Sequence, residues 1–219
     1  MLKGIIFDFD GTLFDSMFIW NTAGEAYLRS VGTEPEKDLQ AVLKPMSLLQ
    51  SAIYIRDKYA IPLSVEEIMN GINHTVEDFY FHTVQPKEGV ATFLEQMKKQ
   101  GVKMCIATAT DRYQVEAALK RCCMEHFFSE IFTCTDVGHG KDEPFIFRKA
   151  MDHLGTTREN TVVFEDAYHA AKTAKEDGFI TVAVYDSCEE KQKELQALSD
   201  FYFENYTETD TFWKFAYGI

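Results

Sequence analysis

Residues 4–16 read GIIFDFDGTLFDS. The apolar run from Ile5 to Phe7 has the length and the β-branched content of a buried strand. Asp8 and Asp10 follow it directly. Because residues two apart on a strand point to the same face, both carboxylates should lie together at the carboxyl end of that strand. Ligands bind at this end of an open α/β sheet. The stretch therefore predicts a buried strand that delivers two acidic groups to a ligand site.

Two carboxylates at this spacing need a counter-charge. Two unit charges about 4 Å apart repel each other by roughly 4 kcal/mol at an effective dielectric constant near 20. A shared proton or a bound cation would relieve this repulsion. A hard cation with oxygen ligands is the simpler solution, and we expect Mg²⁺.

The composition narrows the class of protein. The chain has 219 residues, of which 46% are hydrophobic, which suits one domain or a core with one insertion. Its net charge of −13 at pH 7 would be repelled by nucleic-acid phosphates and by anionic lipids. No run approaches the roughly 18 consecutive apolar residues of a membrane span. We therefore expect neither nucleic acid nor a membrane as a partner.

Cysteine usage and the start of the chain favour a cytoplasmic protein. The five cysteines are odd in number, and no two of them form a C-x-x-C pair. Such a set is typical of reduced thiols in the cytoplasm. In addition, Asp8 interrupts the first apolar run too early for the hydrophobic segment of a secretory leader.

The hydrophobic periodicity divides the rest of the chain. Between residues 16 and 82 apolar residues recur every three or four positions without a strand pattern, so this block should be an inserted all-helical cap. From residue 83 onward short apolar runs alternate with helical segments, which indicates a parallel sheet covered by helices on both faces. We therefore predict an α/β protein with a Rossmann-like core made of residues 1–15 and 83–219 and a cap made of residues 16–82. Further strands are expected near 103–108, 131–134, 161–164, 180–184 and 200–203, and core helices near 90–97, 111–122, 145–154 and 167–177.

A second group of polar residues follows the strand expected at 103–108. Thr108 and Ala109 lie where that strand should meet the next helix, in the stretch IATAT at residues 106–110. A hydroxyl and backbone N–H groups at a helix N-terminus suit a phosphate oxygen. A threonine considered alone at this position would more often be a strand-end residue that caps the helix.

Two further motifs bring a lysine and an acidic pair. Lys141 lies in the stretch GKDEPF at residues 140–145, just ahead of a predicted helix, where its ammonium could reach a carboxylate-rich site. Glu165 and Asp166 follow the apolar run VVF at residues 162–164, so they should meet the same sheet edge as the first motif. Considered alone, the lysine would be solvated and one acid would serve as a first-turn helix charge.

Together the four motifs resemble those of the haloacid dehalogenase superfamily, whose first motif has the form D-x-D-G-T/V. The helical insertion is similar to that of its helical-cap subclass, which includes phosphoglycolate phosphatases and β-phosphoglucomutases. The resemblance implies that Asp8 is the nucleophile, forming an aspartyl-phosphate, and that Asp10 is the general acid and base. It also implies that Thr108 and Ala109 bind the transferring phosphate, and that Lys141 balances the charge of Asp8 and the phosphate.

The same resemblance implies a Mg²⁺ site. Its ligands would be Asp8, the backbone carbonyl of Asp10, Asp166 and, directly or through water, Glu165. The chain departs from the family after the acidic pair. Many relatives have a glycine-containing turn there, whereas this chain has AYHAA at residues 167–171, which could alter the loop beside the metal.

Three interpretations of function follow. The first is a Mg²⁺-dependent phosphatase that hydrolyses a small phosphorylated metabolite. The second is a phosphomutase like β-phosphoglucomutase, and two departures count against it. Trp20 replaces the histidine that those mutases carry five positions after the residue matching Asp15, and the segment KPMS at residues 44–47 lacks the arginine of their G-x-x-R loop. The third is a binding module for phosphometabolites without turnover, which the presence of all four motifs disfavours.

Two other sets of residues carry weaker expectations. His139 and His169 lie in loops near the third and fourth motifs, where they could touch a substrate. The aromatic residues near the C-terminus are expected to pack against the sheet edge; they are Phe212, Trp213, Phe215 and Tyr217.

Overall fold

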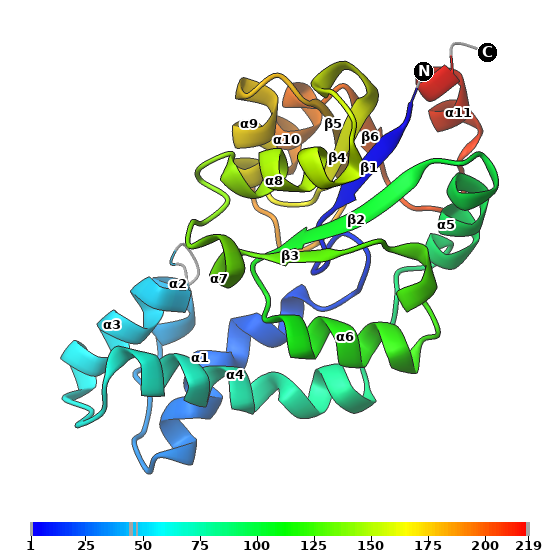
Figure 1. Ribbon diagram of the computed structural model, residues 1–219. Helices are drawn as coiled ribbons and strands as arrows, with labels where there is room; N and C mark the ends of the chain where they lie inside the picture. The colour runs from blue at the N-terminus through cyan, green and yellow to red at the C-terminus, as the bar shows by residue number, and fades with distance from the viewer. Residues whose placement is uncertain (1, 44–45, 47, 218–219) are drawn as a thin grey trace. The chain divides into compact units, whose positions relative to one another are not determined.

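The computed structural model describes residues 2–43, 46 and 48–217 (Figure 1). Lys44, Pro45 and Ser47 of the KPMS segment lie outside the described residues. The expectation that this loop lacks the arginine of the mutases therefore also falls outside the described residues. Contacts within the chain define two compact units, one made of Met1–Asp15 with Val84–Ile219 and the other of Ser16–Thr83.

The first unit is built on a six-stranded sheet in which neighbouring strands are parallel. The strand order is β3-β2-β1-β4-β5-β6, so the direction of winding reverses between β1 and β4. Ligands bind in the crevice at the carboxyl ends of two such strands. The predicted α/β fold class is confirmed. The strands are β1 (Gly4–Phe7), β2 (Lys103–Thr108), β3 (Ile131–Thr133), β4 (Thr161–Glu165), β5 (Ile180–Val184) and β6 (Phe201–Phe203).

Helices of the same unit surround this sheet (Figure 1). Among them α10 was not predicted from the sequence, and α7 begins at Cys134, which was predicted to end a strand. The strand stops at Thr133 because the hydroxyl of that residue accepts a hydrogen bond from the Asp136 N–H at 3.0 Å and so caps α7. The helices are α5 (Val90–Lys99), α6 (Arg112–Arg121), α7 (Cys134–Val137), α8 (Phe145–Leu154), α9 (Tyr168–Glu176), α10 (Gln192–Leu198) and α11 (Asp210–Tyr217), with 3₁₀ turns at Glu125–Phe127 and Arg158–Asn160.

Alternate residues of the central strands fill two separate cores, because neighbouring side chains on a strand point to opposite faces. Ile6 and Val163 belong to a buried cluster with the apolar sides of α8 and α9. Phe7 and Phe164 lie on the other face, where their ring centroids are 6.4 and 5.7 Å from that of Phe93 in α5. The central strands β1 and β4 are thus buried on both faces, which explains why each contains three consecutive large apolar residues, IIF in β1 and VVF in β4.

The C-terminal aromatic residues add to the second of these cores. Phe212 of α11 is fully buried, and its ring centroid lies 5.3 Å from that of Phe203 in the edge strand β6. It also lies 5.7 Å from the ring of Phe164 in β4. The expected packing at the sheet edge is confirmed for Phe212, although the helix that carries it was not predicted.

The second unit, Ser16–Thr83, is helical and contains no strand among its described residues. Its α4 begins with a capping box, in which Ser64 Oγ accepts from Glu67 N at 3.2 Å and Ser64 N donates to Glu67 Oε2 at 2.8 Å. The Trp20 indole N–H in α1 donates to the Tyr80 hydroxyl in α4 at 2.8 Å. The helices are α1 (Met17–Ser30), α2 (Leu39–Leu43), α3 (Leu48–Tyr59) and α4 (Val65–His82).

The helices of both units were compared with the requirements of a membrane span. Among the residues that the structure describes, no helix has the length together with the apolar character that a bilayer crossing requires.

An ion-pair cluster on the first unit gives a pH-dependent prediction. Asp177 follows α9 and accepts hydrogen bonds from Arg148 and Arg158, which lower the pKa of its carboxyl. The stabilisation is therefore full above the unfolded-state pKa of about 3.9 and is lost as the pH falls through the lower folded-state value. Asp177→Asn is expected to lower the melting temperature at pH 7 by roughly 2–4 °C. Thermal melts at several pH values should show a constant difference above about pH 5 that shrinks below about pH 4, and a difference that persists at pH 3 would contradict this assignment.

Candidate active site

The acidic residues of the first and fourth motifs meet where the winding of the sheet reverses. Asp8 directly follows β1, Glu165 is the last residue of β4, and these two strands are neighbours. The Asp8 N–H donates to the Phe164 carbonyl at 2.9 Å, which extends the strand pairing by one residue. Carboxylate oxygens of Asp8, Glu165 and Asp166 all lie within 4.8 Å of one another, and all three residues are buried. The structure thus brings together the three acids that the sequence predicted as metal ligands through their side chains.

Lys141 of the third motif lies inside this acidic cluster. Its ammonium nitrogen is 2.6 Å from Asp8 Oδ1 and 2.6 Å from Glu165 Oε1, and only 6% of its side chain is exposed. Burial alone would lower the pKa of Lys141, but the charges of Asp8 and Glu165 raise it above its ordinary value. The residue is therefore a buried cation that links the ends of β1 and β4.

One ammonium does not balance three carboxylates. Burial, and then the charge of Asp8, raise the pKa of Glu165 and of Asp166 well above the ordinary range, which means that the cluster as it stands resists full ionisation. Within the described residues, Glu165 Oε2 is buried without a hydrogen-bond partner. A buried polar atom of this kind calls for an explanation such as an ion.

A divalent cation fits this donor set. All the donors are carboxylate oxygens, the ligand type that Mg²⁺ takes, and two oxygens on opposite sides of one Mg²⁺ ion are roughly 4.2 Å apart. One carboxylate oxygen from each of Asp8, Glu165 and Asp166 lies within 4.8 Å of the others, so one ion could contact all three. A charge of +2 would also offset the excess of two carboxylates over Lys141 and favour their ionised forms.

The second motif contacts the first through Thr110. The Thr110 hydroxyl donates to Asp10 Oδ2, and the Thr110 N–H donates to Thr108 Oγ1 at 3.1 Å. Asp10 and Thr108 are both buried, whereas Ala109 between the two threonines is exposed. The structure therefore places the Asp10 side chain against the second motif, and the role of its backbone carbonyl as a metal ligand stays a prediction.

Three contributors to this region were not predicted. Thr12 Oγ1 donates to Asp166 Oδ1 at 2.9 Å, and Thr110 orients Asp10 as described above. Thr12 and Thr110 both lie inside the motif stretches, so their hydroxyls, close in sequence to the predicted site residues, could have indicated these contacts. Tyr206, whose hydroxyl donates to the Thr12 carbonyl at 3.2 Å, lies 194 residues away from it in the sequence and had no such signal.

The two histidines differ in their surroundings. His139 is exposed, stacks on Phe145 with ring centroids 4.3 Å apart, and lies 2.5 Å from Glu143 Oε2. His169 lies in the first turn of α9 rather than in the predicted loop, and this residue is exposed as well. Partial desolvation by neighbouring protein groups, and then the charge of Lys141, lower the pKa of His169, so that its imidazole is more readily neutral.

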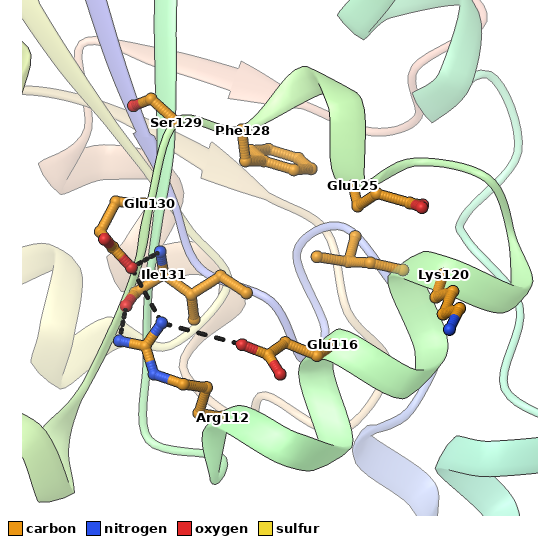
Figure 2. Close-up of a pocket in the computed structure, with 9 residues that line it drawn as sticks. Arg112, Glu116, Lys120, Glu125, Phe128, Ser129, Glu130 and Ile131 are labelled. Atoms are coloured by element: carbon orange, nitrogen blue, oxygen red, sulfur yellow. Dashed lines mark hydrogen bonds and ion pairs between the residues drawn. The ribbon is translucent and has the colours of Figure 1, made fainter.

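A surface hollow on the first unit belongs to a different region (Figure 2). It has a volume of about 290 Å³ and is lined by α6, β3 and the connection between them. Arg112 is its principal cation, and acids already surround it: Glu130 Oε1 at 2.8 Å, Asp136 Oδ2 at 2.9 Å and Glu116 Oε1 at 3.9 Å. No residue of the predicted site lines the hollow. Its lining carries two cations, Arg112 and Lys120, against three acids, Glu116, Glu125 and Glu130, so its net negative charge disfavours a phosphate.

Comparison with known proteins identifies the class. Residues 5–184 match the model of the family described as haloacid dehalogenase-like hydrolase, and the chain belongs to this family. The expectation that the protein is a hydrolase enzyme is confirmed. Over 183 residues, which are 81% of this chain and 82% of the relative, it is 25% identical to a phosphorylated carbohydrates phosphatase of Thermotoga maritima. It is 32% identical to the pyrophosphatase PpaX of Bacillus cereus over 120 residues, about half of each chain (55% and 56%).

Solved structures share the fold over nearly the whole length. CbbY from Rhodobacter sphaeroides, solved in complex with phosphate, has a TM-score of 0.84 at 20% identity and matches 96% of this chain and 97% of its own. A β-phosphoglucomutase from Clostridium difficile has a TM-score of 0.74 at 18% identity, covering 100% and 98% of the two chains. At these identities the likeness shows the fold alone.

Proposed function

We propose that the protein is a Mg²⁺-dependent phosphatase that hydrolyses a small phosphorylated metabolite through an aspartyl-phosphate on Asp8. The observation that carries this proposal is the buried Lys141 ammonium, which lies 2.6 Å from both Asp8 and Glu165 inside a cluster of three acids. A buried, paired carboxylate at the switch point of an α/β sheet has the surroundings of a nucleophile for a phosphate dianion.

In the first step Asp8 attacks phosphorus, and the bond from phosphorus to the leaving oxygen breaks. Asp8 Oδ1 accepts from the Phe9 N–H at 2.7 Å and from Lys141, which fixes the carboxylate and reduces its repulsion toward the phosphate. Asp10, whose Oδ2 accepts from the Thr110 hydroxyl, protonates the leaving alkoxide. The Thr108 hydroxyl, whose oxygen accepts from the Thr110 N–H, donates to a phosphate oxygen.

In the second step water cleaves the aspartyl-phosphate. Asp10, now a carboxylate, takes a proton from the water as it attacks phosphorus, and Asp8 leaves as a carboxylate. Asp10 is thereby protonated again, so the cycle closes with inorganic phosphate as the second product. Asp8, Glu165, Asp166 and the Asp10 carbonyl would hold the metal, which when bound supplies a Lewis acid that offsets the charge of the phosphate.

A specific contact favours hydrolysis over a mutase reaction. Trp20, at the position where the mutases have histidine, donates its indole N–H to Tyr80 at 2.8 Å. An indole is a donor only and cannot exchange a proton with a sugar hydroxyl as imidazole can. This contact supports water, rather than a sugar hydroxyl, as the acceptor of the phosphoryl group in our proposal.

The relatives suggest which substrates to test first. One is named for phosphorylated carbohydrates and another for pyrophosphate, and both substrates present a phosphoryl group on a small polar molecule. We therefore propose a phosphorylated carbohydrate as the first substrate class and inorganic pyrophosphate as the second.

The test is a phosphate-release assay with p-nitrophenyl phosphate, followed by a panel of sugar phosphates and pyrophosphate. Activity is expected with Mg²⁺ and should fall to background in EDTA, because the three acids then lack their second counter-charge. The same Mg²⁺ addition should raise the melting temperature of the wild type and leave that of Asp166→Asn nearly unchanged. Isomerisation of a sugar phosphate that depends on its bisphosphate would indicate a mutase, and binding without release would indicate a non-catalytic module.

A further inference from the structure

The chain beyond the family match contributes contacts to the loop of the first motif. The match ends at residue 184, and the loop turns between Phe9 and Phe14, where Gly11 N donates to the Phe14 carbonyl and Leu13 N to the Phe9 carbonyl, each at 2.9 Å. The carbonyls of Thr12 and Leu13 both accept hydrogen bonds from outside the turn. One of the two donors is Tyr206, which lies beyond the match.

The second donor is also tied to the C-terminal segment. Lys87 N donates to the Leu13 carbonyl at 2.9 Å, while the Lys87 ammonium donates to the Tyr185 carbonyl at 2.6 Å and to Asp186 Oδ2 at 3.0 Å. The Asp186 side chain is only 4% exposed. Residues 185–206 therefore hold two consecutive carbonyls of the loop, one directly and one through Lys87.

Tyr206 is fixed by packing on several sides. Its ring stacks on Phe203, with centroids 5.1 Å apart and planes at 20°, and lies 5.3 Å from Phe93. A Cβ at residue 89 would lie 2.6 Å from the Tyr206 carbonyl carbon, so glycine is required at that contact, and Gly89 also has a φ of +84°. With its ring held in this way, the hydroxyl is positioned to donate to the Thr12 carbonyl at 3.2 Å.

Thr12 connects Tyr206 to the acidic cluster. Its hydroxyl donates to Asp166 Oδ1 at 2.9 Å, and the residue is fully buried. The bond engages one oxygen of Asp166 and restricts rotation of the carboxylate. Removing a group that holds a metal ligand in this way typically weakens metal binding by roughly 10–100-fold.

We propose that Tyr206 is a positioning residue of the metal site: its hydroxyl fixes the Thr12 peptide, and Thr12 Oγ1 in turn holds the Asp166 carboxylate ready for a divalent cation. This inference rests on the proposed Mg²⁺-dependent function. It assigns a role to a part of the chain outside the family match, and it predicts an effect on metal affinity that exceeds the effect on folding.

The test measures Mg²⁺ binding directly, by isothermal titration calorimetry without substrate. Tyr206→Phe removes one hydroxyl and keeps the ring stacking, and it is expected to weaken Mg²⁺ binding roughly 3–10-fold. The matched control is Tyr202→Phe, which removes a hydroxyl that donates to Gln192 Oε1 at 3.3 Å in the same segment and should leave the affinity unchanged. An equal affinity for wild type and Tyr206→Phe, with only a lower melting temperature, would show a purely structural role and overturn the inference.

A double-mutant cycle tests the route through Thr12. Thr12→Val should weaken Mg²⁺ binding at least as much as Tyr206→Phe, and Thr12→Ser should restore it. Because both residues act on Asp166 in series, the double variant that combines Thr12→Val with Tyr206→Phe should bind no more weakly than Thr12→Val alone. Additive losses would overturn the proposed route. If the wild type itself binds no Mg²⁺, the proposed function fails and this inference with it, whereas a failure of the Tyr206 and Thr12 variants alone leaves the proposed function intact.

Discussion

Asp8→Asn is expected to lower kcat by roughly 10³-fold or more while the protein remains folded. The amide cannot attack phosphorus, so the aspartyl-phosphate does not form. Asparagine is nearly the same size as aspartate and can still accept from the Phe9 N–H at its Oδ1 position, where the wild type has a bond of 2.7 Å. Because one of three crowded carboxylates is removed, the melting temperature in EDTA should stay the same or rise.

The measurement compares steady-state turnover with trapping of the intermediate. Wild-type protein quenched in acid during turnover should carry a phosphoryl group on the peptide that contains Asp8, and Asp8→Asn should carry none. The matched control is Asp142→Asn, which changes an exposed carboxylate next to Lys141 in sequence and is expected to stay within about threefold of the wild type. Turnover by Asp8→Asn above a tenth of the wild-type rate would exclude the covalent route.

The parts of the fold that the sequence predicted are those with a dense apolar signal. The strands β1, β2, β4 and β5 are buried on both faces of the sheet, so each contains a run of mostly apolar residues that is visible without an alignment. Helix α10 was missed because it has only seven residues, QKELQAL, of which Leu195 alone is buried, and so short a segment shows no clear helical period. Helix α7 was missed because it has four residues and starts from a side-chain cap on Thr133.

The residues of the candidate site also fall into those that the sequence predicted and those that it missed. Asp8, Lys141, Glu165 and Asp166 each stand directly beside a predicted strand end or helix start, and parallel strands bring such ends to one edge. Tyr206 could not be found in this way, because its contact with Thr12 spans 194 residues and depends on packing against Phe203 and Gly89. Local patterns thus predict the groups at the strand ends, and only the tertiary packing shows which residues hold them.

Lys141→Met is expected to have the largest effect on stability, lowering the free energy of unfolding at pH 7.5 in EDTA by about 3–5 kcal/mol. The pKa of Lys141 is raised in the folded state by Asp8 and Glu165, although burial opposes this. Its stabilising effect is therefore full below the unfolded-state pKa of about 10.4 and is lost only as the pH rises through the folded-state value. Methionine has a similar length without the charge, and it leaves three buried carboxylates uncompensated.

Two conditions should restore part of this loss. As the pH falls, the carboxyls that burial keeps at a raised pKa take up protons and the repulsion weakens, so the difference from wild type shrinks. Saturating Mg²⁺ should also restore stability, because the cation supplies charge at the same place, but it should not restore kcat. Urea titrations of wild type, Lys141→Met and the control Lys103→Met, whose ammonium donates to the neutral Leu154 carbonyl at 2.7 Å, make the comparison. If Lys141→Met lowers the free energy of unfolding no more than Lys103→Met does, the acids around Lys141 are not ionised. That result would contradict the electrostatic argument for Asp8 as the nucleophile.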